Sequence, residues 1–132
     1  NNMRQLVTLS LLQQQNASER LRGVTYAYRM AESDTEVLSA LLETINHDPN
    51  VNVRLAAVDA LHGCSGSPVA RRGLLQSLSR QESPLVQVSL IDTLAEMKDE
   101  QAVPALRTLA GDQAANPQVR QRAEWALGRL SH

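Results

Sequence analysis

The residues best suited to chemistry in this chain of 132 residues are three histidines and one cysteine. His62 and Cys64 are both common metal ligands, but a separation of two residues places their side chains on different sides of a helix. His47 and His132 stand apart from them, at a turn and at the terminus, and a zinc site needs more ligands at matching spacing. The sequence therefore predicts no metal site and no cofactor.

Motifs for nucleophilic catalysis and phosphate binding do not occur. Serine is frequent, but no G-x-S-x-G motif is present, so no Ser–His–Asp arrangement is indicated. The glycine- and serine-containing run 63–67 lacks the lysine and the strand context of a phosphate loop. We therefore expect a protein that is not an enzyme.

Composition points to helices and excludes some classes of partner. Leu (20) and Ala (16) dominate the apolar residues, while there are two Tyr, one Trp and no Phe, which favours an all-α fold. The 13 basic and 14 acidic residues give a net charge of −1, which argues against a nucleic-acid surface or a contact with an anionic membrane. No apolar run is long enough to span a bilayer.

A repeat of about 33 residues organises the chain. The apolar positions Val53, Ala57, Leu61 and Cys64 share one helix face, and adding 33 twice finds apolar residues at every equivalent position. Good N-cap residues recur in one column, at Asn50, Ser83 and Asn116. A fainter copy lies 34 residues upstream, where Glu19 and Gly23 fall in core columns.

Partner helices occupy the intervals between these copies. The apolar stripe from Val37 to Ile45 is one of them, with Ser33 and Glu36 as the expected capping box. The pattern predicts eight helices in four antiparallel pairs, at about 2–14/17–31, 34–46/50–64, 67–80/83–97 and 100–111/116–131. We expect a single domain over 1–132, with pairs at about 2–31, 34–64, 67–97 and 100–131. Because a helical pattern begins almost at once, we also expect the domain to be cut from a longer chain.

Three segments carry a family resemblance. DPNVNVRLAAVDAL, SPLVQVSLIDTL and NPQVRQRAEWALGRL resemble the second helix of a HEAT repeat, especially the short HEAT-like repeats also found in phycobilisome lyases. The resemblance covers 34–131 well and 2–31 loosely. It implies a right-handed α-α superhelix (solenoid) of antiparallel helix pairs that usually serves protein–protein binding. The lyase activity of some relatives is not carried by these motifs.

A narrower resemblance concerns the N-terminal half. LLQQQNASERLRGVTYAYRM followed by VLSALLETINHDPNVNVRLAAVDAL is similar to the C-terminal HEAT domain of certain bacterial membrane-anchored anti-sigma factors. The zinc-binding domain and the membrane helix of those proteins have no counterpart in this sequence. The resemblance therefore implies only context and an extracytoplasmic (periplasmic) location, with a cytoplasmic location as the alternative.

The family arrangement also implies a candidate surface, a concave groove formed by columns of the second helices. Trp125 either covers the end of the last pair or anchors a partner, and Leu55 and Val88 either face the groove or complete the packing. The candidate residues are Arg22, Thr25, Tyr28, Leu55, Asp59, His62, Val88, Asp92, Arg122 and Trp125.

A column of arginines is the candidate structural link between pairs. Arg20, Arg54 and Arg120 occupy one column, in which the third pair has Gln87. The resemblance implies that such arginines tie one repeat to the next, with Asp48 as the partner of Arg54 and Asp112 as its counterpart in the last pair.

These features favour a non-catalytic protein-binding or sensory scaffold, with an unidentified protein partner and no membrane contact by the domain itself. One alternative is an accessory, lyase-like component of an enzyme, and another is a structural oligomerisation spacer. HEAT-like hydroxylases bind iron through His-Glu pairs, and the sequence has no His-Glu dipeptide. HEAT-like DNA glycosylases need a basic groove, whereas these columns carry Asp59 and Asp92.

Overall fold

The computed structural model describes residues 2–131, and within this range the chain is all-α. The first helices of the four pairs are α1 (Asn2–Leu12), α3 (Thr35–His47), α5 (Pro68–Arg80) and α7 (Val103–Gly111). The second helices are α2 (Ala17–Ala27), α4 (Val51–Leu61), α6 (Pro84–Glu96) and α8 (Pro117–Leu130). Two short 3-10 turns, η1 (His62–Cys64) and η2 (Glu100–Ala102), lie after α4 and before α7. The prediction of eight helices in four pairs is confirmed.

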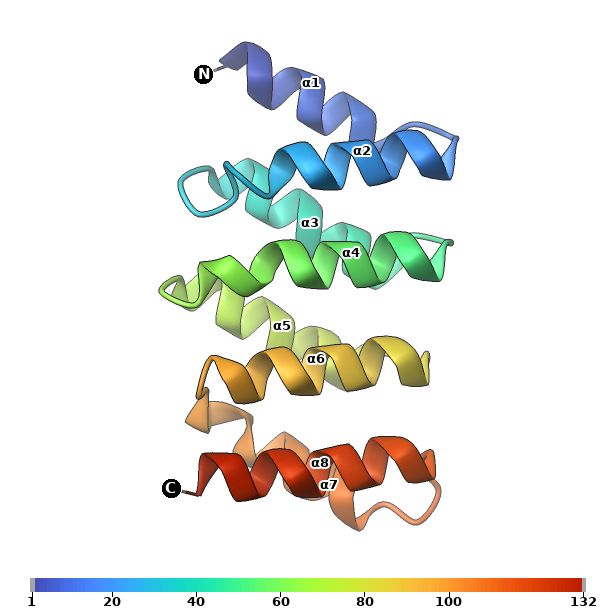
Figure 1. Cartoon of the computed structure of the whole chain (residues 1–132), viewed down its shortest axis with the longest axis vertical. Helices are drawn as coiled ribbons and strands as arrows, with labels where there is room; N and C mark the ends of the chain where they lie inside the picture. The colour runs from blue at the N-terminus through green and yellow to red at the C-terminus, as the bar shows by residue number, and fades with distance from the viewer. Residues whose placement is uncertain (1, 132) are drawn as a thin grey trace.

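The pairs stack in chain order as two layers. In Figure 1, α2, α4, α6 and α8 lie side by side in the front layer, and the first helices lie behind them. Each second helix packs on its own partner and on the second helix of the next pair. No helix within residues 2–131 has the length and apolar character to cross a membrane.

Side-chain caps set where the helices begin. Asn16, Asn50 and Asn116 each accept hydrogen bonds from two backbone N–H groups of the helix that follows. Ser67 and Ser83 cap α5 and α6, which both begin with proline. These caps are short-range features, and they explain why the helix starts follow so closely from the sequence.

The expected cap of α3 was wrong by one residue. The Oδ1 atom of Asp34 accepts from the backbone N–H groups of Glu36 and Val37, at 3.1 and 3.2 Å. The hydroxyl of Ser33 instead donates to the carbonyl of Met30. A carboxylate one residue later thus replaces the predicted capping box.

The core lies between the two layers and follows the predicted columns. Val53, Ala57, Leu61 and Cys64 are all buried, as are most of their equivalents in α6 and α8. Met97 is half-buried. One pair could not cover these residues, so burial of the stripe depends on the stacking of neighbouring pairs.

Gly23 explains why the first copy of the repeat departs from the pattern. A Cβ at this position would lie 2.9 Å from the backbone nitrogen of Leu12 and 3.0 Å from Cβ of Leu11. Glycine in this core column therefore lets α2 approach the end of α1 closely, where the later pairs have Ala or Leu.

Arginines link successive pairs, but their hydrogen-bond partners differ from the predicted ones. Nε and Nη2 of Arg20 donate to the two carboxylate oxygens of Asp48, at 2.7 and 3.1 Å. Arg54 donates to the carbonyl of Ile45 at 2.9 Å and to the side-chain oxygen of Gln81. Asp48 and Gln81 both directly follow the first helix of a pair, so each arginine reaches the turn of the next pair. Asp48 thus pairs with Arg20, and its predicted pairing with Arg54 was wrong.

The link does not continue into the last pair. Nε2 of Gln87 donates to the backbone carbonyl of Gln81 in its own pair, because its side chain is shorter than that of arginine. Arg120 donates to Oε1 of Gln113, also within its own pair, so its predicted role between repeats was wrong. Asp112 accepts from the backbone of Ala114 and is not the expected counterpart of Asp48.

Two glycine substitutions should have opposite effects on stability. Gly23→Ala should lower the free energy of unfolding by about 1–3 kcal/mol, because its Cβ meets backbone atoms of another helix. Gly128→Ala in α8 should raise it by about 0.5–1 kcal/mol, because nothing lies within 4 Å and alanine favours the helix. Urea denaturation followed by circular dichroism measures both, and a stabilised Gly23→Ala variant would contradict the close approach.

The pair between Arg20 and Asp48 should contribute more stability than an exposed pair. Its side chains are 11% and 4% exposed, so Arg20→Met leaves a nearly buried carboxylate without its cation. We expect a loss of about 2–4 kcal/mol in the free energy of unfolding. The matched control is Arg22→Met, which removes an exposed pair with Glu19 and should have no measurable effect. Equal denaturation midpoints for the two variants would refute the assignment.

Candidate functional site

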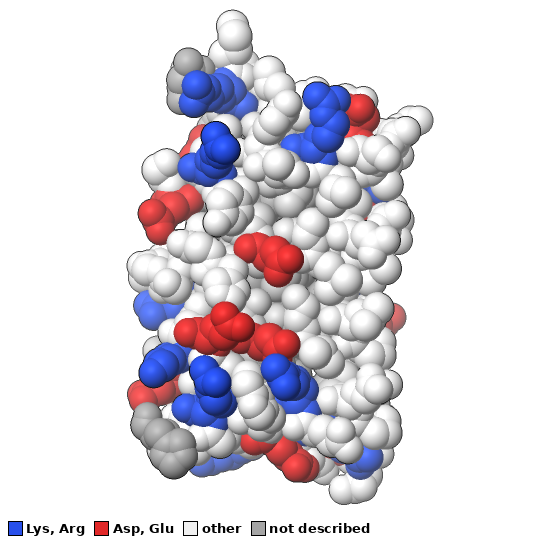
Figure 2. All heavy atoms as spheres, viewed as in Figure 1, with Lys and Arg blue, Asp and Glu red and all other residues white. Residues whose placement is uncertain are grey.

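The ten predicted surface residues share a helical register. Each of them lies five, six, nine or twelve residues after the N-cap of its own second helix. Residues at these spacings share one face of a helix. Because the second helices lie side by side, these residues fall on one side of the molecule, the side shown in Figure 2. We call this set of ten residues the second-helix face.

Burial divides the second-helix face into two groups. Leu55 and Val88 are partly buried and pack against the core, which confirms the interpretation that they complete the packing. The other eight residues are exposed or half-exposed. The structure thus leaves mainly polar and aromatic side chains available on this face.

Two polar side-chain contacts connect neighbouring second helices across this face. Nε2 of His62 lies 2.8 Å from Oε2 of Glu96, and Arg122 contacts the carboxylate of Asp92. Each pair joins residues about thirty positions apart in the sequence. All four side chains are between one third and about one half exposed, so these pairs add little stability, but they orient the groups involved. Glu96 was not among the predicted residues, because it lies thirteen residues after its N-cap, one position beyond the predicted columns.

Trp125 does not close the end of the stack. It remains 36% exposed, and the guanidinium carbons of Arg122 and Arg129 lie 3.6 and 5.3 Å from its ring centroid. Both distances are within the range of cation–π contacts. Of the two alternatives for Trp125, covering the last pair or anchoring a partner, this partly exposed ring beside two arginines favours the second.

The charges on this side of the molecule have a simple arrangement. Figure 2 shows acidic side chains near the middle and basic side chains toward both ends. Asp59 has no ion-pair or hydrogen-bond partner among the described residues, whereas Asp92 is paired with Arg122. An acidic centre disfavours a phosphate backbone.

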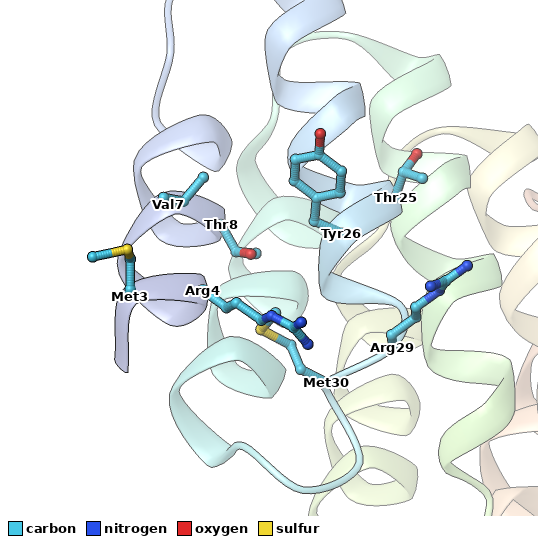
Figure 3. Close-up of a pocket in the computed structure, with 8 residues that line it drawn as sticks. All are labelled: Met3, Arg4, Val7, Thr8, Thr25, Tyr26, Arg29 and Met30. Atoms are coloured by element: carbon cyan, nitrogen blue, oxygen red, sulfur yellow. The ribbon is translucent and has the colours of Figure 1, made fainter. Parts of the chain in front are cut away.

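A hollow of about 600 Å³ lies elsewhere, at the N-terminal end of the stack between α1 and α2. Figure 3 shows Met3 and Val7 on the α1 side and Tyr26 on α2, with Arg4 and Met30 between the two helices. Of the second-helix face, only Thr25 lines this hollow.

Sequence reasoning missed this hollow. A signal was present, because α1 carries more apolar residues than one buried stripe requires, and Met3, Leu6 and Val7 remain exposed. Of the nine large apolar side chains that are exposed among the described residues, six lie on α1, on α2 or directly after α2.

The described residues hold no cluster of three or more His, Cys, Asp or Glu side chains that could bind a metal ion. Cys64 is buried in the core, and this burial raises the pKa of its thiol, as does the negative charge of Glu32. The reactive thiolate is therefore disfavoured. His132 lies outside the described residues.

Comparisons with known proteins agree with this architecture. A family model described as HEAT repeats matches residues 71–132, which contain all but the first residues of α5 and all of α6, α7 and α8. The chain is also 34% identical over 101 residues to a protein of Pseudanabaena tenuis named uncharacterized phycocyanin operon protein Z. The aligned region covers 76% of this chain and 47% of that relative, so the chain spans about half the length of the relative.

These comparisons bear differently on the two resemblances. A relative named after a phycocyanin operon supports the broader resemblance, to the repeats of phycobilisome lyases, and gives no support to the narrower one with anti-sigma factors. An extracytoplasmic location stays a prediction. The stacked helix pairs and the HEAT-repeat match lead to one conclusion: residues 71–132 are HEAT repeats, and the described chain is built as a stack of HEAT-like helix pairs.

Proposed function

We propose that this protein is a non-catalytic scaffold that binds a protein partner through the second-helix face. The observation that carries the proposal is Trp125, whose ring is held partly exposed between Arg122 and Arg129. Tryptophan and arginine are the residue types that most often dominate protein–protein binding energy. The HEAT-repeat match over residues 71–132 supports the same function, because these repeats generally bind proteins.

The charges of the second-helix face would select the partner. Asp59 on α4 and Asp92 on α6 lie on the two middle pairs and favour a basic centre in the partner, while Trp125 on α8 offers an apolar anchor on the last pair. Complementary charges chiefly determine specificity and the rate of association. A non-catalytic role fits this set of groups, since they hold no nucleophile with a general base beside it.

The test of this surface is the loss of a partner on removal of the Trp125 side chain. Trp125→Ala should weaken binding at least about tenfold, because an aromatic anchor is lost while the core is untouched. The control is Leu85→Ala, which removes an exposed apolar side chain at the start of α6, outside the second-helix face. Proteins retained on the immobilised chain from an extract of its own cells are compared by quantitative mass spectrometry. Identical sets of proteins on wild type, Trp125→Ala and Leu85→Ala would refute the proposal.

A second candidate function is favoured by the relative named phycocyanin operon protein Z. We propose that the partner class is a phycobiliprotein subunit, which would make this chain an accessory component of phycobilisome assembly or of a bilin lyase. This candidate narrows the first one and does not replace it, because an accessory component also acts by protein binding.

Purified phycocyanin subunits, with and without bilin, test this second candidate. We expect coelution with this chain in size-exclusion chromatography, weakened by Trp125→Ala. We expect no covalent attachment of bilin when the chain is mixed with apo-subunit and free bilin, as followed by zinc-stained denaturing gels. Absence of coelution would refute the phycobiliprotein partner, and attachment of bilin would refute the non-catalytic role.

A further inference from the structure

The hollow between α1 and α2 differs from every junction inside the stack. Val7 in α1, Ala40 in α3 and Gly73 in α5 are spaced by 33 residues, and each directly precedes a buried residue in the middle of its helix. A Cβ at Gly73 would lie 2.5 Å from Cδ1 of Leu42 in the preceding pair, so this column faces the previous pair. The internal junctions thus have a small residue in this column, and the first pair has a valine that is 48% exposed.

The second helices show the same difference. Ten residues after their N-caps, α4, α6 and α8 carry Ala60, Thr93 and Ala126, which are all buried. The equivalent residue of α2 is Tyr26, which is 45% exposed. Bulky side chains in both of these columns would hold a further helix pair away from its regular spacing, because packed interfaces do not tolerate such added volume.

Exposed apolar residues extend this surface along α1. Leu6 is exposed, and the residues 33 and 66 positions later are the polar Ser39 and Arg72, also exposed. Together with the exposed Met3 and Val7, Leu6 forms a run of apolar side chains on α1, and such a contiguous exposed group indicates a binding surface where a single residue would not. The hollow of about 600 Å³ is within the size range of binding pockets.

The charge of the first pair indicates the sign of the occupant. Arginine is the only charged residue type among the side chains that line the hollow, and none of those side chains is acidic. Arg4 and Arg29 line the hollow itself. Arg22 lies one helical turn before Tyr26 on α2, where Tyr26 and the negative charge of Glu19 raise the pKa of its guanidinium. If two copies of the chain docked through this same hollow, the arginines of both copies would come together, which is unfavourable.

From this geometry we propose that the hollow between α1 and α2 binds an acidic amphipathic helix of a partner protein. The apolar stripe of that helix would insert between Met3 and Val7 on one side and Tyr26 on the other. Its carboxylates would face Arg4 and Arg29. A helix suits this place because a groove between two helices accepts the side-chain ridge of a third, and because the described residues offer no strand edge for an extended peptide.

This inference rests on the proposed function only in that both concern protein binding, and the two surfaces can be tested separately. The probe is a synthetic helical peptide with a leucine stripe flanked by glutamates, labelled with fluorescein. The control peptide has the same sequence with every glutamate replaced by lysine. Fluorescence anisotropy with the whole chain should give micromolar binding for the acidic peptide and binding at least about tenfold weaker for the basic one.

Two valines of equal exposure provide the matched variants. Val7→Asp should weaken binding of the acidic peptide at least about tenfold, because a charge enters the apolar hollow. Val69→Asp on α5 should leave it unchanged, although Val69 is 47% exposed against 48% for Val7. Circular dichroism should show native helix content for both variants. Equal weakening by the two variants, or no binding of either peptide to wild type, would overturn the proposal.

Three further measurements complete the test. Arg29→Glu should reduce the preference for the acidic peptide, and an unchanged preference would contradict the role of charge. Trp125→Ala should leave peptide binding intact, so failure of the second-helix face and failure of this hollow are distinguishable. If sedimentation shows a dimer of the wild type that Val7→Asp disrupts, a second copy occupies the hollow and the proposal is wrong.

Discussion

Burial of the apolar stripe between successive helix pairs is the constraint on which this structure depends. A single pair cannot bury its own apolar stripe, so each pair is stable only against its neighbours. Residues such as Leu61, Leu90 and Leu94 reach complete burial because a second pair closes over them. The function of the surface follows from this constraint, since only the columns that the stacking leaves outside are available for binding.

Polar contacts then set how one pair sits on the next. The nearly buried pair of Arg20 and Asp48 and the contact of Arg54 with Gln81 both join a second helix to the turn of the following pair. An arginine in such a place acts through a planar fork of donors, which restricts the angle between the groups it joins. In the third pair the equivalent residue is Gln87, which does not reach the following pair. The third and fourth pairs are instead bridged at the surface by Arg122 and Asp92.

The two ends of the stack differ in chemistry, and this difference distinguishes the two binding proposals. The first pair exposes Leu6, Val7 and Tyr26 and has an excess of arginine. Val58 and Ile91 are buried at equivalent positions of the second and third pairs. The equivalent residue of the last pair is Glu124, which is exposed. Glu124 therefore gives the outer side of α8 a polar surface, whereas the outer side of the first pair is apolar, and it is this apolar side that we propose binds a partner helix.

The sequence by itself determined the all-α class, the eight helices, the caps of all the second helices and most of the buried columns. These are local features, since the 3.6-residue period selects the buried face of a helix and a cap such as Asn50 acts within three residues. Tertiary structure decided the rest. Asp48 had two arginines as possible partners, and only the stacking of pair on pair chose Arg20. The exposure of Trp125 and the hollow beside Tyr26 depend in the same way on which helix lies opposite, which a periodic pattern does not specify.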